Sequence, residues 1–463
     1  MNGNRKQIEL TRRQVLKGGV HGVLAATLGN SVWLGGCSSR NDKANIILIT
    51  LDTTRADHLG CYEYHRPTSP NLDRLAEQSM LYTRMIAPSS WTLPSHASLF
   101  TGKFPSCHGA HYDEAGRMRL TQGIEGPAHW DELRARALDA NALTLATLLK
   151  EAGYATGAVV GGPWMKSIFE LNRGFEFYDD EDISTVNGRR AEPITASAVK
   201  WIETLGEKRF FLFLNYFDVH HPFNAPGKYG TAFFPPGAVP GRTKETVETY
   251  RAGYDGELLY MDHHIGRLMT KLKDLKLYDN SWIIVTADHG DLLGEHGKTG
   301  HGKYLTQHEL HIPLFMKYPH GEVSPGQSDS RVQLIDLLPL ICDHHDLPLP
   351  DGIQGNLPSE VQHPIFAETY PLKATTLDGH WRAIFDGDFK FIWNSLGRHQ
   401  LFNLAKDPEE NHNLFGKEPK RDQQLLAKLD TYLNGLPKPA KSDFVKGVDE
   451  KTIQALKAQG YLK

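Results

Sequence analysis

The segment from Ser90 to Gly102 combines a hydroxyl side chain with the expected start of a short helix. Pro94 suits the first turn, because its missing N–H group would have no partner there. Gly102 suits a left-handed residue at the helix C-terminus. Thr92 would then lie beside free backbone N–H groups and the positive end of a helix dipole, where an anion is stabilised. The pattern predicts either a nucleophilic hydroxyl or an ordinary capped helix.

Three aspartates directly follow apolar runs that predict buried strands. Asp52 follows residues 45–50, Asp218 follows 210–217, and Asp288 follows 282–286. Nearly continuous apolar runs are typical of parallel strands buried on both faces. Ligand sites in such sheets lie beyond the C-terminal ends of the strands. We therefore expect these three carboxylates at one edge of a sheet.

The elements that must position these side chains alternate between strand and helix. A further strand is predicted at 156–160, and helices are predicted at 68–78, 144–152, 196–205 and 254–275. This alternation favours an α/β sheet with helices on both faces. Two long polar or proline-rich loops, 113–139 and 224–243, are expected to form walls over the site.

From about residue 364 the pattern changes to short antiparallel strands. Residues 381–393 predict a hairpin that turns at Asp386-Gly387. A short strand at 400–404, an Asp-Pro-Glu-Glu turn from Asp407, and a helix at 423–433 follow. This segment predicts a small C-terminal subdomain.

The Thr92 segment resembles the signature of the sulfatase family, a branch of the alkaline phosphatase superfamily. That signature is Cys or Ser, any residue, Pro, Ser, Arg, then a short helix ending in Thr-Gly. The matching residues are Pro94, Ser95, Thr101 and Gly102. Two positions depart from the signature: Thr92 occupies the nucleophile position and His96 the arginine position. The C-terminal segment is also similar to the family's small antiparallel sheet, up to Asn413-Leu414.

The resemblance implies a fold and a domain division. We expect an alkaline-phosphatase-like α/β fold, with a mixed, mostly parallel sheet flanked by helices and a small C-terminal antiparallel-sheet subdomain. The catalytic domain is expected at 44–362 and the C-terminal subdomain at 363–463.

The resemblance also implies a metal site. By the family pattern, the ligands would be Asp52, Asp288, His289 and the Thr92 oxygen. Thr53 replaces a second family aspartate and is not expected to bind. Oxygen ligands favour Ca²⁺ or Mg²⁺, whereas an imidazole shifts the preference toward Zn²⁺ or Mn²⁺. One divalent metal ion is expected, and a second ion held by Asp218, His220 and His301 stays open.

Other residues are assigned by the same resemblance. His220 and His301 are expected to be catalytic groups that contact the anion. His96 and Lys303 are expected to bind substrate.

Thr92 bears on the reaction. Sulfatases convert their Cys or Ser to formylglycine, and the extra methyl group of threonine prevents oxidation to that aldehyde. Superfamily phosphatases and phosphodiesterases use a plain Ser or Thr hydroxyl that a metal activates. We therefore expect an enzyme, a metal-dependent hydrolase of sulfate or phosphate esters, leaning to phosphate mono- or diesters. The alternatives are a sulfuric ester hydrolase without formylglycine, a phosphoryl-headgroup transferase, and a catalytically dead binding lipoprotein.

The N-terminus predicts export. Residues 11–17 resemble a twin-arginine signal, and Leu34-Gly35-Gly36-Cys37 resembles a lipoprotein box. We expect a signal peptide at 1–36, lipidation of Cys37 and a periplasmic, membrane-anchored enzyme. The expected partners are a small-molecule, glycan or lipid anionic ester and a membrane reached only through the lipid anchor. The net charge of -4 gives no indication of nucleic-acid binding.

Overall fold

The computed structural model describes residues 44–111, 135–139, 141–183, 188–242, 244–358, 365–369 and 379–437, with 450, 452 and 454. Residues Lys43–Lys463 form one compact unit. The predicted signal peptide, Cys37, most of the 113–139 loop and the predicted boundary at 362 lie outside the described residues. None of the described helices has the length and apolar character needed to cross a membrane.

An eight-stranded mixed sheet organises this unit, with strand order β10-β2-β9-β6-β1-β5-β3-β4. All neighbouring strands in it run parallel except β9, which is antiparallel to both β2 and β6. In chain order the strands are β1 Asn45–Leu51, β2 Met80–Ile86, β3 Ala155–Val160, β4 Phe177–Asp179, β5 Phe210–Tyr216, β6 Ser281–Thr286, β9 His311–Lys317 and β10 Gly326–Gln333. The predicted α/β class and mostly parallel sheet are confirmed.

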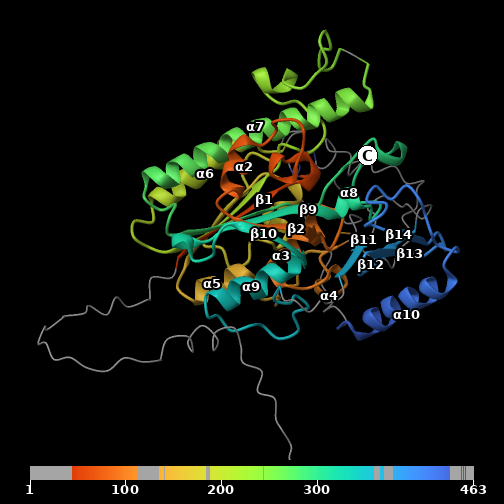
Figure 1. The fold of residues 1–463 in the computed structure, drawn as a ribbon. Coiled ribbons are helices and arrows are strands. Elements are labelled where there is room, and N and C mark those ends of the chain that lie inside the picture. Colours follow the sequence, from red (N-terminus) through yellow and green to blue (C-terminus); the bar gives the residue numbers. More distant parts are fainter. Residues whose placement is uncertain are drawn as a thin grey trace, which may run out of the picture. The chain divides into compact units, whose positions relative to one another are not determined.

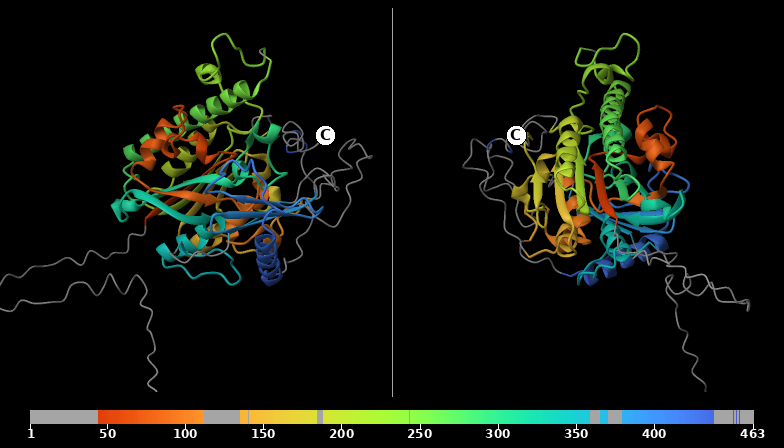
Figure 2. Two further views of the ribbon diagram at one scale, coloured as in Figure 1. Left: turned by 45° about the vertical axis from the view of Figure 1, so that its right-hand side comes forward. Right: turned by 90° about the vertical axis from the view of Figure 1, so that its left-hand side faces the viewer.

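Helices cover both faces of the sheet (Figures 1 and 2). One face carries α2 Pro70–Ala76, α6 Ala191–Glu203 and α7 Val247–Asp274. The other face carries α3 Thr92–Thr101, α5 Leu145–Glu151 and α9 Leu337–His344. Both surfaces of β1, β5 and β6 are therefore buried, which explains their nearly continuous apolar sequences.

A four-stranded antiparallel sheet forms the C-terminal part of the fold, as predicted (Figure 2). Its strands are β11 Ile365–Thr369, β12 Trp381–Asp386, β13 Phe389–Asn394 and β14 Gln400–Asn403, followed by α10 Pro419–Gly435. The short elements α4 Pro105–His108 and α8 Gln307–Leu310, and the two-stranded ribbon β7 Leu292–Leu293 and β8 Thr299–Gly300, complete the regular structure used below.

Sequence patterning missed strands β2, β4, β9 and β10 of the large sheet and placed the starts of α6 and α7 too late. β2 and β9 were not predicted, and β10 reads Gly-Gln-Ser-Asp-Ser-Arg-Val-Gln, with little apolar character. Pairing with β2 stabilises this edge strand, and such tertiary pairing has no local signal. Helix α7 begins at Val247 rather than at 254, because Thr246 and Thr249 form a capping box.

Candidate active site

Two neighbouring strands deliver three potential metal ligands to one point. Strands β1 and β6 are parallel, with Thr50 opposite Thr286, so their C-terminal ends are level. Asp52 and the Asp288-His289 pair follow these ends. One ligand atom from each of the three side chains lies within 4.8 Å of the other two, and all three side chains are buried.

Thr92 lies against this cluster. Helix α3 begins at Thr92, after an extended Trp91, and ends at Gly102 with a left-handed φ of 65°. The Thr92 hydroxyl oxygen lies 3.3 Å from Nε2 of His289. The predicted helix therefore places the hydroxyl beside the carboxylates and the imidazole that the family resemblance groups with it.

The protonation of His289 leaves Nε2 available as a ligand. Nδ1 lies 2.8 Å from the carbonyl oxygen of Gly290, and since a carbonyl can only accept, Nδ1 donates. Burial lowers the pKa of His289 to about 4, which favours the neutral ring. Nε2 then presents its lone pair toward Thr92 and toward Oδ2 of Asp288, 3.3 Å away. This is the tautomer and outer hydrogen bond usual for metal-bound histidine.

Several carboxylate oxygens at this point have no hydrogen-bond donor in the described part of the chain. They are Oδ1 of Asp52, Oδ2 of Asp288 and Oδ2 of Asp291. Burial, and then the charge of Asp288, raises the pKa of Asp52 well above its ordinary value. Within the described residues no lysine or arginine pairs with these three groups. Buried, unpaired carboxylates are costly unless a cation compensates them, so the donor set fits a divalent metal ion.

His220 and His301 lie beside the cluster. The rings of His301 and His289 have centroids 4.5 Å apart, and those of His301 and His220 are 5.0 Å apart. Nδ1 of His220 donates to the carbonyl of His221 at 2.7 Å. His301 pairs through Nδ1 with Asp291 at 3.3 Å. The structure thus brings both predicted catalytic histidines to the cluster edge.

The two predicted substrate-binding residues, His96 and Lys303, differ in burial. His96 is fully buried. Its Nδ1 donates to the Thr92 carbonyl at 2.9 Å, its Nε2 lies 3.0 Å from the Thr50 hydroxyl, and Asp288 is 3.6 Å away. Lys303 is exposed on the loop after His301. His96 therefore contacts the nucleophile segment and a predicted ligand from within the core.

Asn215 and Asp291 were missed by sequence reasoning. The Asn215 amide donates to Oδ2 of Asp52 at 3.2 Å, and Asn215 lies opposite Thr50 in the β1–β5 pairing. A polar residue near the end of a buried strand is the signal that could have identified it. Asp291 was visible in the Asp-His-Gly-Asp segment, and only the fold shows that it pairs with His301.

Thr53 contributes to the site through its backbone. Its φ of 55° lies in the left-handed region. Its N–H group donates to Oδ1 of Asp288 at 3.2 Å, and its hydroxyl donates to the Val219 carbonyl at 3.0 Å. The hydroxyl is therefore engaged by a backbone carbonyl of the loop after β5.

Asp218 belongs to a second, separate group of buried charges. Its Oδ1 accepts a hydrogen bond from the Ala191 backbone at 3.0 Å and lies 3.9 Å from the guanidinium of Arg190. Arg190 in turn pairs with Glu257 at 2.5 Å. Among the described residues, the Asp52, Asp288 and His289 cluster is the one group suited to a metal ion. Asp218, His220 and His301 do not form a second one.

Comparison with known proteins agrees with this geometry. The sulfatase family model matches residues 44–347, and a model described as N-sulphoglucosamine sulphohydrolase, C-terminal, matches residues 294–438. An ulvan-active sulfatase of Formosa agariphila is 23% identical over 440 residues, covering 85% of this chain and 80% of the relative.

Two solved structures share the fold. One is a protein in complex with its substrate D-glucosamine-2-N,6-O-disulfate, with a TM-score of 0.69, 19% identity and coverage of 85% of this chain and 98% of the other. The other is a phosphonate monoester hydrolase of Agrobacterium radiobacter, with a TM-score of 0.69, 19% identity and coverage of 85% and 96%.

The mixed sheet and the cluster at its strand ends are those of an alkaline-phosphatase-like fold, and the family model and curated relatives make the chain an ester-hydrolysing enzyme. Within that class, the chain belongs to the sulfatase family.

Proposed function

We propose that this protein is a metal-dependent hydrolase of anionic esters that uses the Thr92 hydroxyl as its nucleophile, with a preference for phosphate mono- or diesters. The position of that hydroxyl, 3.3 Å from Nε2 of His289 and beside two buried aspartates, is the observation that carries the proposal. Oxidation of threonine would give a ketone, so the aldehyde chemistry of other sulfatases is closed to this side chain.

Asp52, Asp288 and His289 would hold the metal ion, together with the Thr92 oxygen. When bound, a divalent cation would supply positive charge that favours ionisation of a neighbouring hydroxyl or water. The burial of all three ligand side chains excludes bulk water and strengthens that effect.

The remaining groups act on the ester. The Thr92 oxygen attacks phosphorus, the ester oxygen leaves, and water then releases the phosphoryl group from Thr92. The start of α3 directs backbone N–H groups toward the developing negative charge. His301, whose Nδ1 pairs with Asp291, would donate a proton to the leaving oxygen. The ring of His220 contacts the ring of His301 and, when protonated at both nitrogens, would stabilise the oxygens of the transferred group through Nε2.

A panel of p-nitrophenyl phosphate, bis-p-nitrophenyl phosphate and p-nitrophenyl sulfate tests the proposal. We expect Thr92→Ala to lower kcat/KM by at least about 1000-fold on the preferred ester, because the nucleophile is removed. Thr92→Ser should keep part of the activity. Ser95→Ala is a matched control, because this hydroxyl in the same helix donates to the Ser89 carbonyl instead.

The panel also separates the alternatives. Turnover that persists in Thr92→Ala would show that the nucleophile is another group. Turnover of the sulfate ester alone would favour a sulfuric ester hydrolase that works without formylglycine, as the sulfatase relatives suggest. Transfer of the phosphoryl group to an added alcohol in place of water would favour a transferase. Metal binding without turnover of any ester would favour a binding protein.

We further propose that the enzyme acts outside the cytoplasm, attached through a lipid on Cys37. The twin-arginine pattern at 11–17 and the Leu-Gly-Gly-Cys sequence support this location. Mass spectrometry of the mature protein tests it, since the first residue should be a lipidated Cys37.

A further inference from the structure

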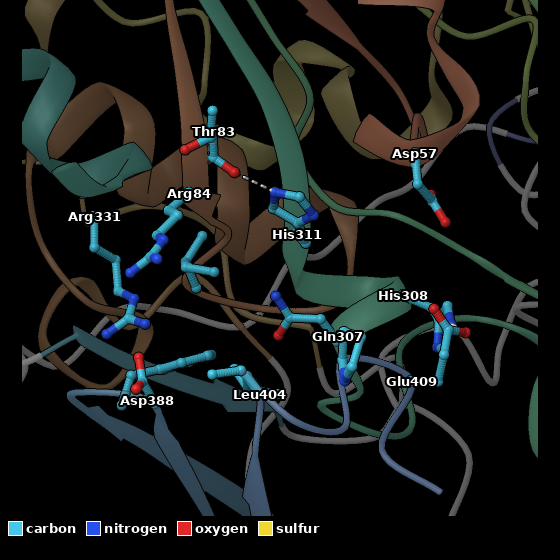
Figure 3. A pocket seen from close by; sticks show the side chains of 14 residues that line it. Asp57, Thr83, Arg84, Gln307, His308, His311, Arg331, Asp388, Leu404 and Glu409 are labelled. Carbon is cyan, nitrogen blue, oxygen red and sulfur yellow. Dashed lines mark hydrogen bonds and ion pairs between the residues drawn. The ribbon is translucent and has the colours of Figure 1, made fainter. Parts of the chain in front are cut away.

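A cavity lies away from the metal cluster, where the edge of the large sheet meets the C-terminal sheet. Its volume is about 310 Å³, at the lower end of the range for ligand pockets. Figure 3 shows its lining, which comes from β2, β9, β10, α8, Asp57 of the short helical turn Ala56–His58, the C-terminal sheet and the loop after β14. None of Asp52, Thr92, Asp288 and His289 lines it.

Two arginines lie together at one end of this cavity. Arg84 of β2 and Arg331 of β10 are direct partners in the parallel strand register. The register shifts just before Arg331 in this pairing, and the β2–β9 pairing also shifts between Tyr82 and Met85. Irregularities of this kind redirect side chains and are frequent near functional sites. Here both arginine side chains line the same cavity (Figure 3).

Like charges on paired strands destabilise a sheet unless something compensates them. In the part of the chain that the structure describes, the exposed side chain of Arg84 forms no ion pair or hydrogen bond, and the half-buried side chain of Arg331 donates only to the Gly387 carbonyl, at 2.9 Å. Burial lowers the pKa of Arg331, and the charge of Arg84 lowers it further. Asp388 also lines the cavity and opposes this effect, although it forms no ion pair with either arginine.

The guanidinium of Arg331 is held in place. It lies over the ring of Phe385 with 5.5 Å between Cζ and the ring centroid. His311 closes the neighbouring wall by donating from Nε2 to the Thr83 carbonyl at 2.8 Å. A planar, fixed guanidinium is well suited to bidentate binding of an oxyanion.

The opposite end of the cavity offers unsatisfied polar atoms. Nδ1 of His308 and Oε1 of Gln307 are buried without a hydrogen-bond partner, and the His308 side chain is only 4% exposed. Both residues line the cavity, and Nε2 of His308 pairs with Glu409 at 3.0 Å. These atoms can bind hydroxyl or water groups attached to an anion that the arginines hold.

We propose that this cavity is a binding site for a tetrahedral oxyanion, a sulfate or phosphate group, held between Arg84 and Arg331. The anion is either a free inorganic ion or a charged group on a larger polar molecule, whose hydroxyl groups reach Gln307 and His308. This site is independent of ester hydrolysis at Thr92.

Anomalous diffraction from crystals soaked in selenate tests the position directly. We expect a selenium peak between Arg84 and Arg331 in the wild-type protein and its loss in Arg84→Gln/Arg331→Gln. Absence of the wild-type peak, under conditions where selenate occupies the metal cluster, would overturn the proposal.

Calorimetric titration of the metal-loaded protein tests affinity. With inorganic sulfate, the double variant should lose one binding event or bind at least about tenfold more weakly, since two charge-assisted contacts are lost. Arg74→Gln, an exposed arginine on α2, is the matched control and should bind as the wild type does. Equal sulfate binding in the double variant would overturn the proposal.

Two further measurements identify the source of the anion and the independence of the site. Tighter binding of a sulfated disaccharide than of inorganic sulfate, lost in the double variant, indicates a group on a larger molecule, whereas equal binding indicates the free ion. Turnover of a p-nitrophenyl ester should be unchanged in the double variant. A proportional loss of turnover would show that the arginines belong to the hydrolytic site and would overturn the proposal.

Discussion

Asp52 and Asp218 follow neighbouring strands of the same sheet, yet the charges around the two acids differ. Asp52, after β1, lies beside Asp288, and each has an oxygen without a donor in the described structure. Asp218, after β5, also has an oxygen without a donor, but it shares Arg190 with Glu257 and accepts a backbone hydrogen bond. The first group lacks positive charge, and the second contains its own.

This difference shows how equal positions in a fold acquire different functions. The end of a parallel strand offers an aspartate a buried place in either case. A nearby guanidinium makes the Asp218 group an internal structural cluster. Its absence near Asp52 leaves a place that a divalent cation can fill.

The largest effect should be on metal affinity, after removal of a carboxylate from the Asp52 and Asp288 group, which has no positive charge nearby among the residues described. Asp52→Asn should weaken binding of Zn²⁺ or Mn²⁺ by more than about 100-fold, because outer partners of a ligand alone alter affinity by about 10- to 100-fold. Asp218→Asn should leave metal affinity unchanged. Isothermal titration of both variants checks this, and equal losses would show that the two acid groups are not functionally distinct.

A smaller effect is expected from His96, which supports the first group from the core. His96→Gln should weaken metal binding by about 10-fold, since the contacts to the Thr92 carbonyl and Asp288 are disturbed. His108→Gln is the control, because this buried histidine bonds to Ser98 and to the Pro94 carbonyl of the same helix. If both variants lose metal affinity equally, His96 acts only through stability of the helix.

The smallest effect is expected on the pH dependence of stability, through Asp218 and Glu257, the two acids beside Arg190. Burial raises the pKa of Glu257 to about 8 and that of Asp218 to about 6. The folded state therefore binds protons more tightly than the unfolded state, and the free energy of unfolding should fall as pH rises from about 4.5 to about 8.

Glu257→Gln should flatten this dependence, whereas Glu248→Gln, an exposed change on the same helix, should not. Denaturant unfolding at pH 5, 6.5 and 8 measures the slope. An unchanged slope in Glu257→Gln would show that Arg190 keeps the Glu257 carboxylate ionised throughout this range.

The sequence predicted the strands that carry the site better than the strands at the edge. β1, β5 and β6 are buried on both faces, so their apolar runs were visible. The position of Asp218 after β5 was also visible, but Arg190 and Glu257 come from other segments, and the fold alone shows that Arg190 lies between the two acids. Arg84 and Arg331 are 247 residues apart, and the pairing of β2 with β10 brings them together.

The left-handed backbone of Thr53 means that the energetic cost of arranging the site is met when the chain folds, before any ion binds. A β-branched residue avoids this conformation, and here the bonds of its N–H group to Asp288 and of its hydroxyl to Val219 hold it there. The loops after β1 and β6 are thus fixed to each other by protein contacts alone. The site is preorganised during folding, and an arriving ion needs little rearrangement of the chain.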